Sequence, residues 1–221
     1  MEREMTDDEE LIASLVSSDA TRPVVVSPAE SVFWRMVVAL TSPLWLGIVV
    51  VAIANRAVRG QLPLFVLHER VGFRRSPLRV PKVATAAVAS NQRRCAGLIE
   101  VATGAPVELE VGGRSDLWMR SMGVDELPQL ALVLAGKMRL VGPRPVTQSE
   151  LDEMIEDGAE VGIDVLHPGI VGLWQVLDRH GYELDERRQL DMVMIDNWSG
   201  RLRRQLLRLA ARQALARLRS G

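Results

Sequence analysis

The feature that most constrains this chain is an uncharged apolar run from Met36 to Ala54, MVVALTSPLWLGIVVVAIA. An apolar run of about 18 residues or more is typical of a helix that enters a lipid bilayer. Pro43 lies near the middle of the run, where it removes a backbone donor and clashes with the preceding turn. The helix should therefore break at Ser42 and Pro43, and nearby hydroxyls such as that of Thr41 could bind the carbonyls left free.

Basic residues flank this run on both sides, with Arg22 and Arg35 before it and Arg56 and Arg59 after it. Basic residues mark the cytoplasmic side of a membrane segment, and neither flank looks external. We therefore expect a re-entrant helix over residues 31–58 that enters and leaves by the same face. A tilted helix that crosses the bilayer and a buried core helix are the alternatives.

The composition excludes several classes of function. The formal net charge is -1, so no global basic field suggests binding to nucleic acid. The single cysteine, Cys95, excludes an intrachain disulfide, and the three histidines are widely spaced, so a zinc site is not expected.

The two ends of the chain differ in charge. Residues 1–30 begin MEREMTDDEE and are expected to form an acidic, disordered tail. Residues 201–221 carry seven arginines and no acid, with Arg204 and Arg208 opposite Leu202 and Leu206 at helical spacing. This pattern predicts a basic amphipathic helix that lies on a membrane surface or packs on the domain.

Residues 97–112 alternate enough to predict two short strands around Gly104. Together with the helical patterns elsewhere, this indicates an α/β fold that is mainly helical. We expect a small membrane-associated domain with a re-entrant helix broken at Ser42 and Pro43, short strands and amphipathic interfacial helices.

Residues 125–136, DELPQLALVLAG, predict a helix with Asp125 as its N-cap and Gly136 as its C-cap. Pro128 then lies in the first turn, where its missing donor is not needed. The free donors and the helix dipole would keep Asp125 ionised and would attract external anions such as phosphate. Ordinary helix capping would explain this motif if it stood alone.

The surrounding motifs favour a chemical role. Arg120 lies five residues before Asp125, and the prolines of GKMRLVGPRP, residues 136–145, restrict the backbone around Arg144. An arginine held in this way suits bidentate binding of phosphate. An acidic pair and two placed arginines beside a membrane anchor would suit a metal-bound diphosphate that meets a lipid.

The ordered motifs resemble those of the bacterial sugar transferases, the monotopic phosphoglycosyl transferases. The resemblance runs from about residue 31 to residue 215. It includes the Ser-Pro break, HERVGF followed by the basic Lys82 region, DELPQL, GKMRLVGPRP, HPGIVGLWQV at residues 167–176 and LDMVMIDNWS at residues 190–199.

This resemblance implies transfer of a sugar 1-phosphate from a nucleotide diphosphosugar, usually a UDP-sugar, to polyprenyl phosphate such as undecaprenyl phosphate, with release of UMP. Asp125 would be the nucleophile and bind Mg²⁺, and Glu126 would be its partner. Arg120 and Arg144 would hold phosphate oxygens, and Lys82 would contact the donor or the lipid headgroups.

The resemblance also implies a place for the domains. Residues 59–200 would form the catalytic domain, on the cytoplasmic face of the bacterial inner membrane and in contact with its lipids. The apolar anchor and the amphipathic tail could both support a homodimer.

The chain departs from the family pattern at KVATA, residues 82–86, where Ala84 and Ala86 replace an expected basic residue and a methionine. A catalytically degenerate, membrane-anchored scaffold of a polysaccharide assembly complex is therefore the alternative function. We expect His167 and His180 to be turn or surface residues, Trp174 to be in the core, and Glu69 and Arg70 to lie outside the catalytic set.

Overall fold

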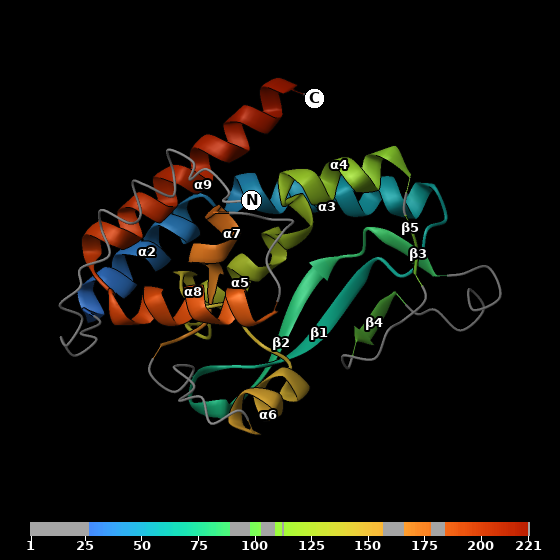
Figure 1. The fold of residues 1–221 in the computed structure, drawn as a ribbon. Coiled ribbons are helices and arrows are strands. Elements are labelled where there is room, and N and C mark those ends of the chain that lie inside the picture. The colour runs from blue at the N-terminus through green and yellow to red at the C-terminus, as the bar shows by residue number, and fades with distance from the viewer. Residues whose placement is uncertain are drawn as a thin grey trace, which may run out of the picture.

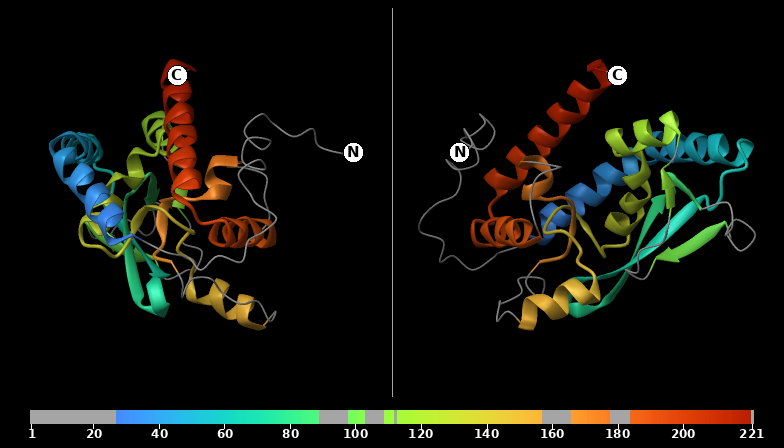
Figure 2. Two further views of the ribbon diagram at one scale, coloured as in Figure 1. Left: turned by 90° about the vertical axis from the view of Figure 1, so that its left-hand side faces the viewer. Right: turned by 45° about the vertical axis from the view of Figure 1, so that its right-hand side comes forward.

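The computed structural model describes residues 27–88, 98–102, 109–111, 113–156, 166–177 and 184–220 (Figures 1 and 2). Most of the predicted acidic tail, together with Cys95 and His180, lies outside these residues. Within them, helices predominate and the strands are short, in agreement with the fold class expected from the sequence.

The apolar run forms two helices, α2 (Pro28–Leu40) and α3 (Ser42–Val58), which meet at an angle of 55°. The break falls at the predicted Ser-Pro pair. The Thr41 hydroxyl donates to the carbonyl of Val37 at 2.9 Å, and the Trp45 indole Nε1 donates to the carbonyl of Val38 at 3.2 Å. The Val37 carbonyl also accepts the Thr41 backbone N–H, whereas the Val38 carbonyl accepts only side-chain donors, from Thr41 and Trp45, among the described residues.

Among the described helices, none is long and apolar enough by itself to cross a membrane, although α2 and α3 together meet that length and composition. Their inner side is buried in the domain through Val38, Trp45, Val49 and Ala52. Their outer side exposes large apolar residues, with Leu40 84% exposed and Val51 69% exposed. A buried core helix, one of the alternatives, does not fit this outer face, because exposed apolar patches of this kind mark contact surfaces.

Three small sheets follow the anchor. β1 (Phe65–Val71) pairs with β2 (Pro77–Val83) in an antiparallel hairpin, and with β4 (Ile99–Ala102) in parallel. β3 (Ala86–Val88) pairs with β5 (Leu109–Val111), and β6 (Arg139–Val141) pairs with β7 (Gly169–Val171). The two strands predicted around Gly104 are β4 and β5, which belong to different sheets.

The remaining helical elements are α4 (Arg114–Met122), η3 (Val124–Gln129), α5 (Leu130–Leu134), α6 (Gln148–Glu156), α7 (Leu173–Leu177), α8 (Leu184–Asp196) and α9 (Gly200–Ser220). A short turn, η1 (Phe73–Arg75), joins β1 to β2. In Figure 1, α4 lies beside α3, and α9 extends past the rest of the domain.

The predicted C-terminal helix is α9, and its first half packs on the domain. Leu202, Leu206 and Leu209 are almost completely buried, in one cluster with Val141 and Leu173. The protein itself therefore covers the apolar face that the sequence also allowed to lie on a membrane. Only the second half exposes large apolar side chains among its described residues, Leu215 and Leu218.

A second core cluster joins the anchor to the turn that carries Asp125. Trp45 and Val49 of α3 share it with Val80 of β2 and Val133 of α5. The end of α3 is also tied to α4, because Arg56 Nη1 donates to Asp116 Oδ1 at 2.8 Å and both side chains are excluded from solvent. The anchor and the carboxylate turn therefore pack as neighbouring parts of one body.

Candidate active site

The acidic pair lies on a short 3₁₀ turn rather than at the start of an α-helix. Gly123, with φ +68°, ends α4 in the left-handed conformation and directs the chain into η3. Asp125 is therefore inside η3 and is not its N-cap, which corrects the sequence prediction. The predicted C-cap region is right, because Gly136, with φ +73°, follows α5.

The two carboxylates of the pair have different environments. Asp125 is only 7% exposed, whereas the side chain of Glu126 is 38% exposed and pairs with Lys82 Nζ at 2.7 Å. Lys82 comes from β2, and β2 packs directly against η3. The hairpin thus brings a lysine 44 residues away onto the carboxylate next to Asp125.

Burial and, to a smaller extent, the neighbouring Glu126 raise the pKa of Asp125 to about 6, although Lys82 and Arg120 act in the opposite direction. The sequence-based expectation that backbone donors hold Asp125 ionised therefore accounts for only part of its environment. Most Asp125 is still ionised at pH 7, since that pH lies above the raised pKa. A carboxylate that is ionised but poorly solvated is suited to act as a nucleophile.

The histidine and arginine of HERVGF belong to this site, although the sequence did not place them there. Lys82 pairs with Val66 in the hairpin, so Lys82 lies on the same face as His68 and Arg70. Burial lowers the pKa of His68 to about 4, and the charges of Lys82, Arg70 and Arg144 add to the effect. His68 is thus neutral at pH 7 within a ring of cations.

Glu69 and Arg70 point to opposite faces of β1 because they are adjacent on one strand. Glu69 pairs with Arg79 at 3.5 Å on the solvent side, and its exclusion from the catalytic set stays a prediction. Arg70 is half-buried, and burial lowers its pKa, with Glu150 and Arg144 also acting on it. Arg70 therefore lies near Arg144, and its exclusion from the catalytic set stays a prediction.

Arg144 is held at its backbone and at its side chain. Its backbone N–H donates to Asp191 Oδ2 at 3.2 Å, and its guanidinium lies 5.1 Å from the centre of the Trp174 ring. Burial raises the pKa of Asp191 to about 7. Trp174 is in the core, as predicted, and serves as a platform for both Arg144 and Arg187.

The other predicted phosphate ligand, Arg120, lies in the last turn of α4 and is exposed. Its charge lowers the pKa of Asp125, so it acts on the acidic pair without being buried beside it. The charge of Arg144 instead acts on His68 and Arg70. Two cations, Arg120 of α4 and Lys82 of β2, thus act on Asp125. Two others, Arg70 of β1 and Arg144 of the Pro-Arg-Pro loop, act on His68.

The acidic pair fits a magnesium ion that is shared with a substrate. The residues that the structure describes contain no group of three or more side chains able to hold a metal by themselves. Mg²⁺ in phosphoryl-transfer sites is commonly held by one or two carboxylates together with substrate phosphates. Asp125 next to Glu126 meets that requirement, and magnesium binding stays a prediction.

An acidic pair and a set of cations, packed on an apolar bent anchor, define a domain that can hold phosphate groups beside a carboxylate. Residues 25–217 match the family described as bacterial sugar transferase, and the chain belongs to this family.

Several curated proteins are similar to the chain. The exopolysaccharide production protein ExoY of Rhizobium meliloti is 40% identical over 81 residues, which are 37% of this chain and 35% of that protein. The undecaprenyl-phosphate galactose phosphotransferase of Salmonella typhimurium is 40% identical over 85 residues, 37% of this chain and 17% of that protein.

A longer match is to the UDP-glucose:undecaprenyl-phosphate glucose-1-phosphate transferase of Klebsiella pneumoniae, which is 29% identical over 171 residues. It covers 74% of this chain and 34% of that protein. The chain thus matches about a third or less of the length of these relatives.

Proposed function

We propose that this chain transfers a sugar 1-phosphate from a nucleotide diphosphosugar, a UDP-sugar, to polyprenyl phosphate, giving polyprenyl-diphospho-sugar and UMP. Undecaprenyl phosphate is the acceptor that the relatives' names suggest. The product would begin the synthesis of a polysaccharide or glycoconjugate. The observation that carries the proposal is the buried Asp125 carboxylate, set between an apolar anchor and several cations.

The reaction proceeds in two displacements at one phosphorus atom. A carboxylate oxygen of Asp125 attacks the phosphorus that bears the sugar, and the bond from this phosphorus to the bridging oxygen breaks, so that UMP leaves. A phosphate oxygen of the lipid then attacks the same phosphorus and displaces Asp125. Two steps allow a soluble donor and a lipid acceptor to use one site in turn.

The basic residues oppose the repulsion between a carboxylate and a diphosphate. Arg120 and Arg144 bind phosphate oxygens, and Lys82 reaches either Glu126 or a bound phosphate. Arg70 adds positive charge beside Arg144. Mg²⁺, held by Asp125 with Glu126 nearby, supplies charge neutralisation when it is bound. The raised pKa of Asp125 follows from burial, which also leaves the carboxylate less solvated and more reactive.

The anchor places this site at the membrane surface. The exposed apolar side of α2 and α3 lies in the lipid, and the bend at Thr41 returns the chain to the cytoplasmic face of the bacterial inner membrane. The lipid phosphate, which lies at headgroup level, then meets Asp125 without leaving the bilayer.

UMP release by the full chain in detergent tests the proposal, with magnesium, undecaprenyl phosphate and a panel of UDP-sugars. We expect release with at least one sugar and loss of release in Asp125→Asn. Asp152→Asn, on the exposed surface of α6, is the matched control and keeps the activity. A folded protein that releases no nucleotide from any donor would favour the scaffold function and would overturn the proposal.

A further inference from the structure

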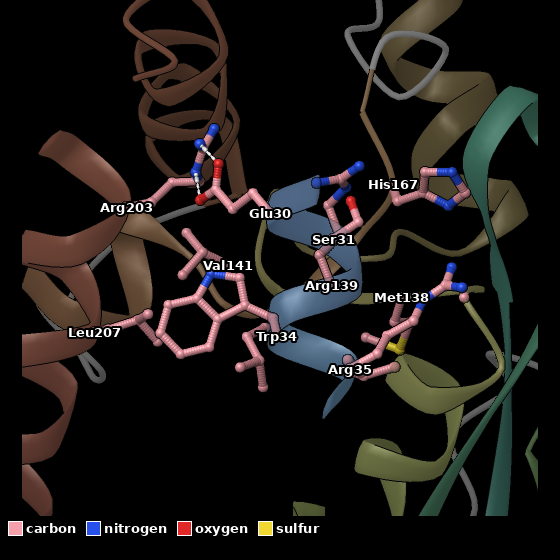
Figure 3. Close-up of a pocket in the computed structure, with 13 residues that line it drawn as sticks. Glu30, Ser31, Trp34, Arg35, Met138, Arg139, Val141, His167, Arg203 and Leu207 are labelled. Carbon is pink, nitrogen blue, oxygen red and sulfur yellow. Dashed lines mark hydrogen bonds and ion pairs between the residues drawn. The ribbon is translucent and has the colours of Figure 1, made fainter. Parts of the chain in front are cut away.

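A second basic pocket lies between α2, β6 and α9, at the other end of α5 from Asp125 (Figure 3). Its lining includes Arg35 and Glu30 of α2, Arg139 of β6 and Arg203 of α9, together with His167 just before β7. No residue of η3 lines it. These residues enclose a cavity of about 60 Å³. A single ordered water needs only about 10–15 Å³, so the cavity has room for a larger polar group.

The charges in this pocket are not balanced. Arg203 forms an ion pair with Glu30, with Nε 2.9 Å from Oε1 and a second contact from Nη2 to Oε2. In the part of the chain that the structure describes, no carboxylate forms an ion pair with Arg35 or Arg139. Three arginines therefore share one acid, and Figure 3 shows the Glu30–Arg203 pair apart from Arg35 and His167.

Two buried nitrogen atoms in the pocket lack hydrogen-bond partners among the described residues. Arg139 Nε and His167 Nδ1 are both inaccessible to solvent and make no hydrogen bond to the described residues. Burial lowers the pKa of Arg139, and the charges of Arg203 and Arg35 lower it further. A buried charged donor without a partner is costly, so an anion that accepts a hydrogen bond from Arg139 Nε would relieve a destabilising arrangement.

The backbone keeps this pocket open for Arg35. Gly136 has φ +73°, and a Cβ at this position would collide with the guanidinium of Arg35. Glycine thus allows Arg35 to cross the end of α5 and reach the pocket, although Arg35 belongs to a different element.

The pocket also borders the lipid-facing surface. Trp34 and Arg35 of α2 line the pocket, and the adjacent Phe33 and Met36 of the same helix are 56% and 67% exposed. An anion that carries acyl chains could place its charge in the pocket and its chains on this apolar side. A free anion would gain only the charge interactions.

We propose that this pocket binds the phosphate group of a membrane lipid, with Arg35 and Arg139 as its ligands, at a site separate from the Asp125 carboxylate. The site is independent of the proposed sugar-phosphate transfer. It would fix the first arm of the anchor at headgroup level through a bound lipid, in addition to the burial of apolar side chains.

Thermal unfolding of the full chain in detergent tests this inference, with dihexanoyl phosphatidic acid as the probe. Sodium phosphate and dihexanoyl phosphatidylcholine are the comparison ligands. We expect phosphatidic acid to raise the unfolding temperature of the unmodified chain at lower concentration than either comparison ligand. Arg139→Gln should weaken this response at least about tenfold, the loss expected for a charge-assisted hydrogen bond.

The matched control is Arg208→Gln, which removes the same charge from an exposed position on α9. It should leave the response to phosphatidic acid unchanged. Without ligand, Arg139→Gln should unfold at the same temperature as the unmodified chain or higher, because it removes a partly buried cation whose Nε has no hydrogen-bond partner. Arg35→Gln, at a more exposed position, gives a second measurement if Arg139→Gln does not fold.

Three results would overturn the inference. Equal responses of Arg139→Gln and Arg208→Gln would show only general charge attraction. An equal response to sodium phosphate would show that the site binds free phosphate. An equal response to phosphatidylcholine would show that the acyl chains alone act on the anchor.

Discussion

At the scale of single residues, the two adjacent carboxylates of the site differ in burial and in ion pairing. Asp125 is buried and has no ion pair in the described part of the chain, whereas Glu126 is half-exposed and bound to Lys82. Glu126 and Lys82 then act on Asp125 with opposite sign. Neighbouring carboxyl groups in such different environments can take different roles in one reaction.

The pH dependence of activity follows from this arrangement. In the proposed reaction only the ionised form of Asp125 attacks phosphorus, so kcat/KM should rise with pH through about 6. Glu126→Gln removes a negative neighbour and should move this midpoint to lower pH. Lys82→Gln removes a positive neighbour and should move it to higher pH. Profiles of UMP release against pH measure both shifts, and a midpoint that neither substitution moves would assign the titration to another group.

The same burial predicts a cost in stability. The folded pKa of about 6 lies above the ordinary value of 3.8, so the folded protein loses stability as pH rises from about 4 to 6. Asp125→Asn removes this charge and should raise the free energy of unfolding at pH 7 by about 1–3 kcal/mol. Unfolding in denaturant at pH 7 and at pH 4 measures the effect, which should be smaller at pH 4. A less stable Asp125→Asn protein at pH 7 would contradict this account.

At the scale of elements, the anchor and α4 are joined by the buried pair of Arg56 and Asp116. Gln61 Nε2 approaches the other oxygen of Asp116 at 3.5 Å, and Arg59 Nη1 binds the Ser115 hydroxyl at 2.5 Å. The end of α3 is therefore attached to the start of α4 by several polar contacts. Since η3 follows α4 after Gly123, this attachment positions the carboxylate turn.

Removal of one member of the buried pair should destabilise the domain strongly. Asp116→Asn removes the negative charge of a buried ion pair, at an expected cost of about 3–5 kcal/mol in the free energy of unfolding. The double substitution Arg56→Met with Asp116→Leu should recover much of this loss, because no buried charge remains. Denaturant unfolding of both variants measures these free energies. If Asp116→Asn has the same free energy of unfolding as the unmodified chain, solvent reaches the pair.

At the scale of the whole molecule, only the first half of α9 contributes buried leucines to the core. Its buried leucines end at Leu209, and Gln213 Nε2 still donates to the carbonyl of Val176 at 2.6 Å. A chain that ends at residue 213 should therefore keep its fold, whereas a chain that ends at residue 200 should not. Each lost leucine is worth about 2–5 kcal/mol. Expression and thermal unfolding of both truncated chains test this, and similar stability of the two would contradict the packing.

The sequence predicted the apolar helical run, its break at Ser42 and Pro43, and a helical segment that begins near the acidic pair, because each depends on residues close together in the chain. It did not predict the β1–β2 hairpin, whose strands contain prolines and alternating charges instead of a clear apolar face. His68 and Arg70 were missed for the same reason, since only the hairpin register places them beside Lys82. The pocket around Arg139 needs the packing of α2 and α9, which are far apart in the sequence.

The attachment of α3 to the carboxylate turn would have a mechanical consequence in the proposed transfer to polyprenyl phosphate. Arg56 and Trp45 join α3 to the elements that carry Asp125, so the depth of α2 and α3 in a bilayer would also set the height of Asp125 above it. The carboxylate would then have a fixed elevation relative to the plane of the lipid headgroups. A thicker or thinner bilayer would move that plane while the protein kept its own dimensions, so membrane thickness would become a variable that acts on the proposed reaction.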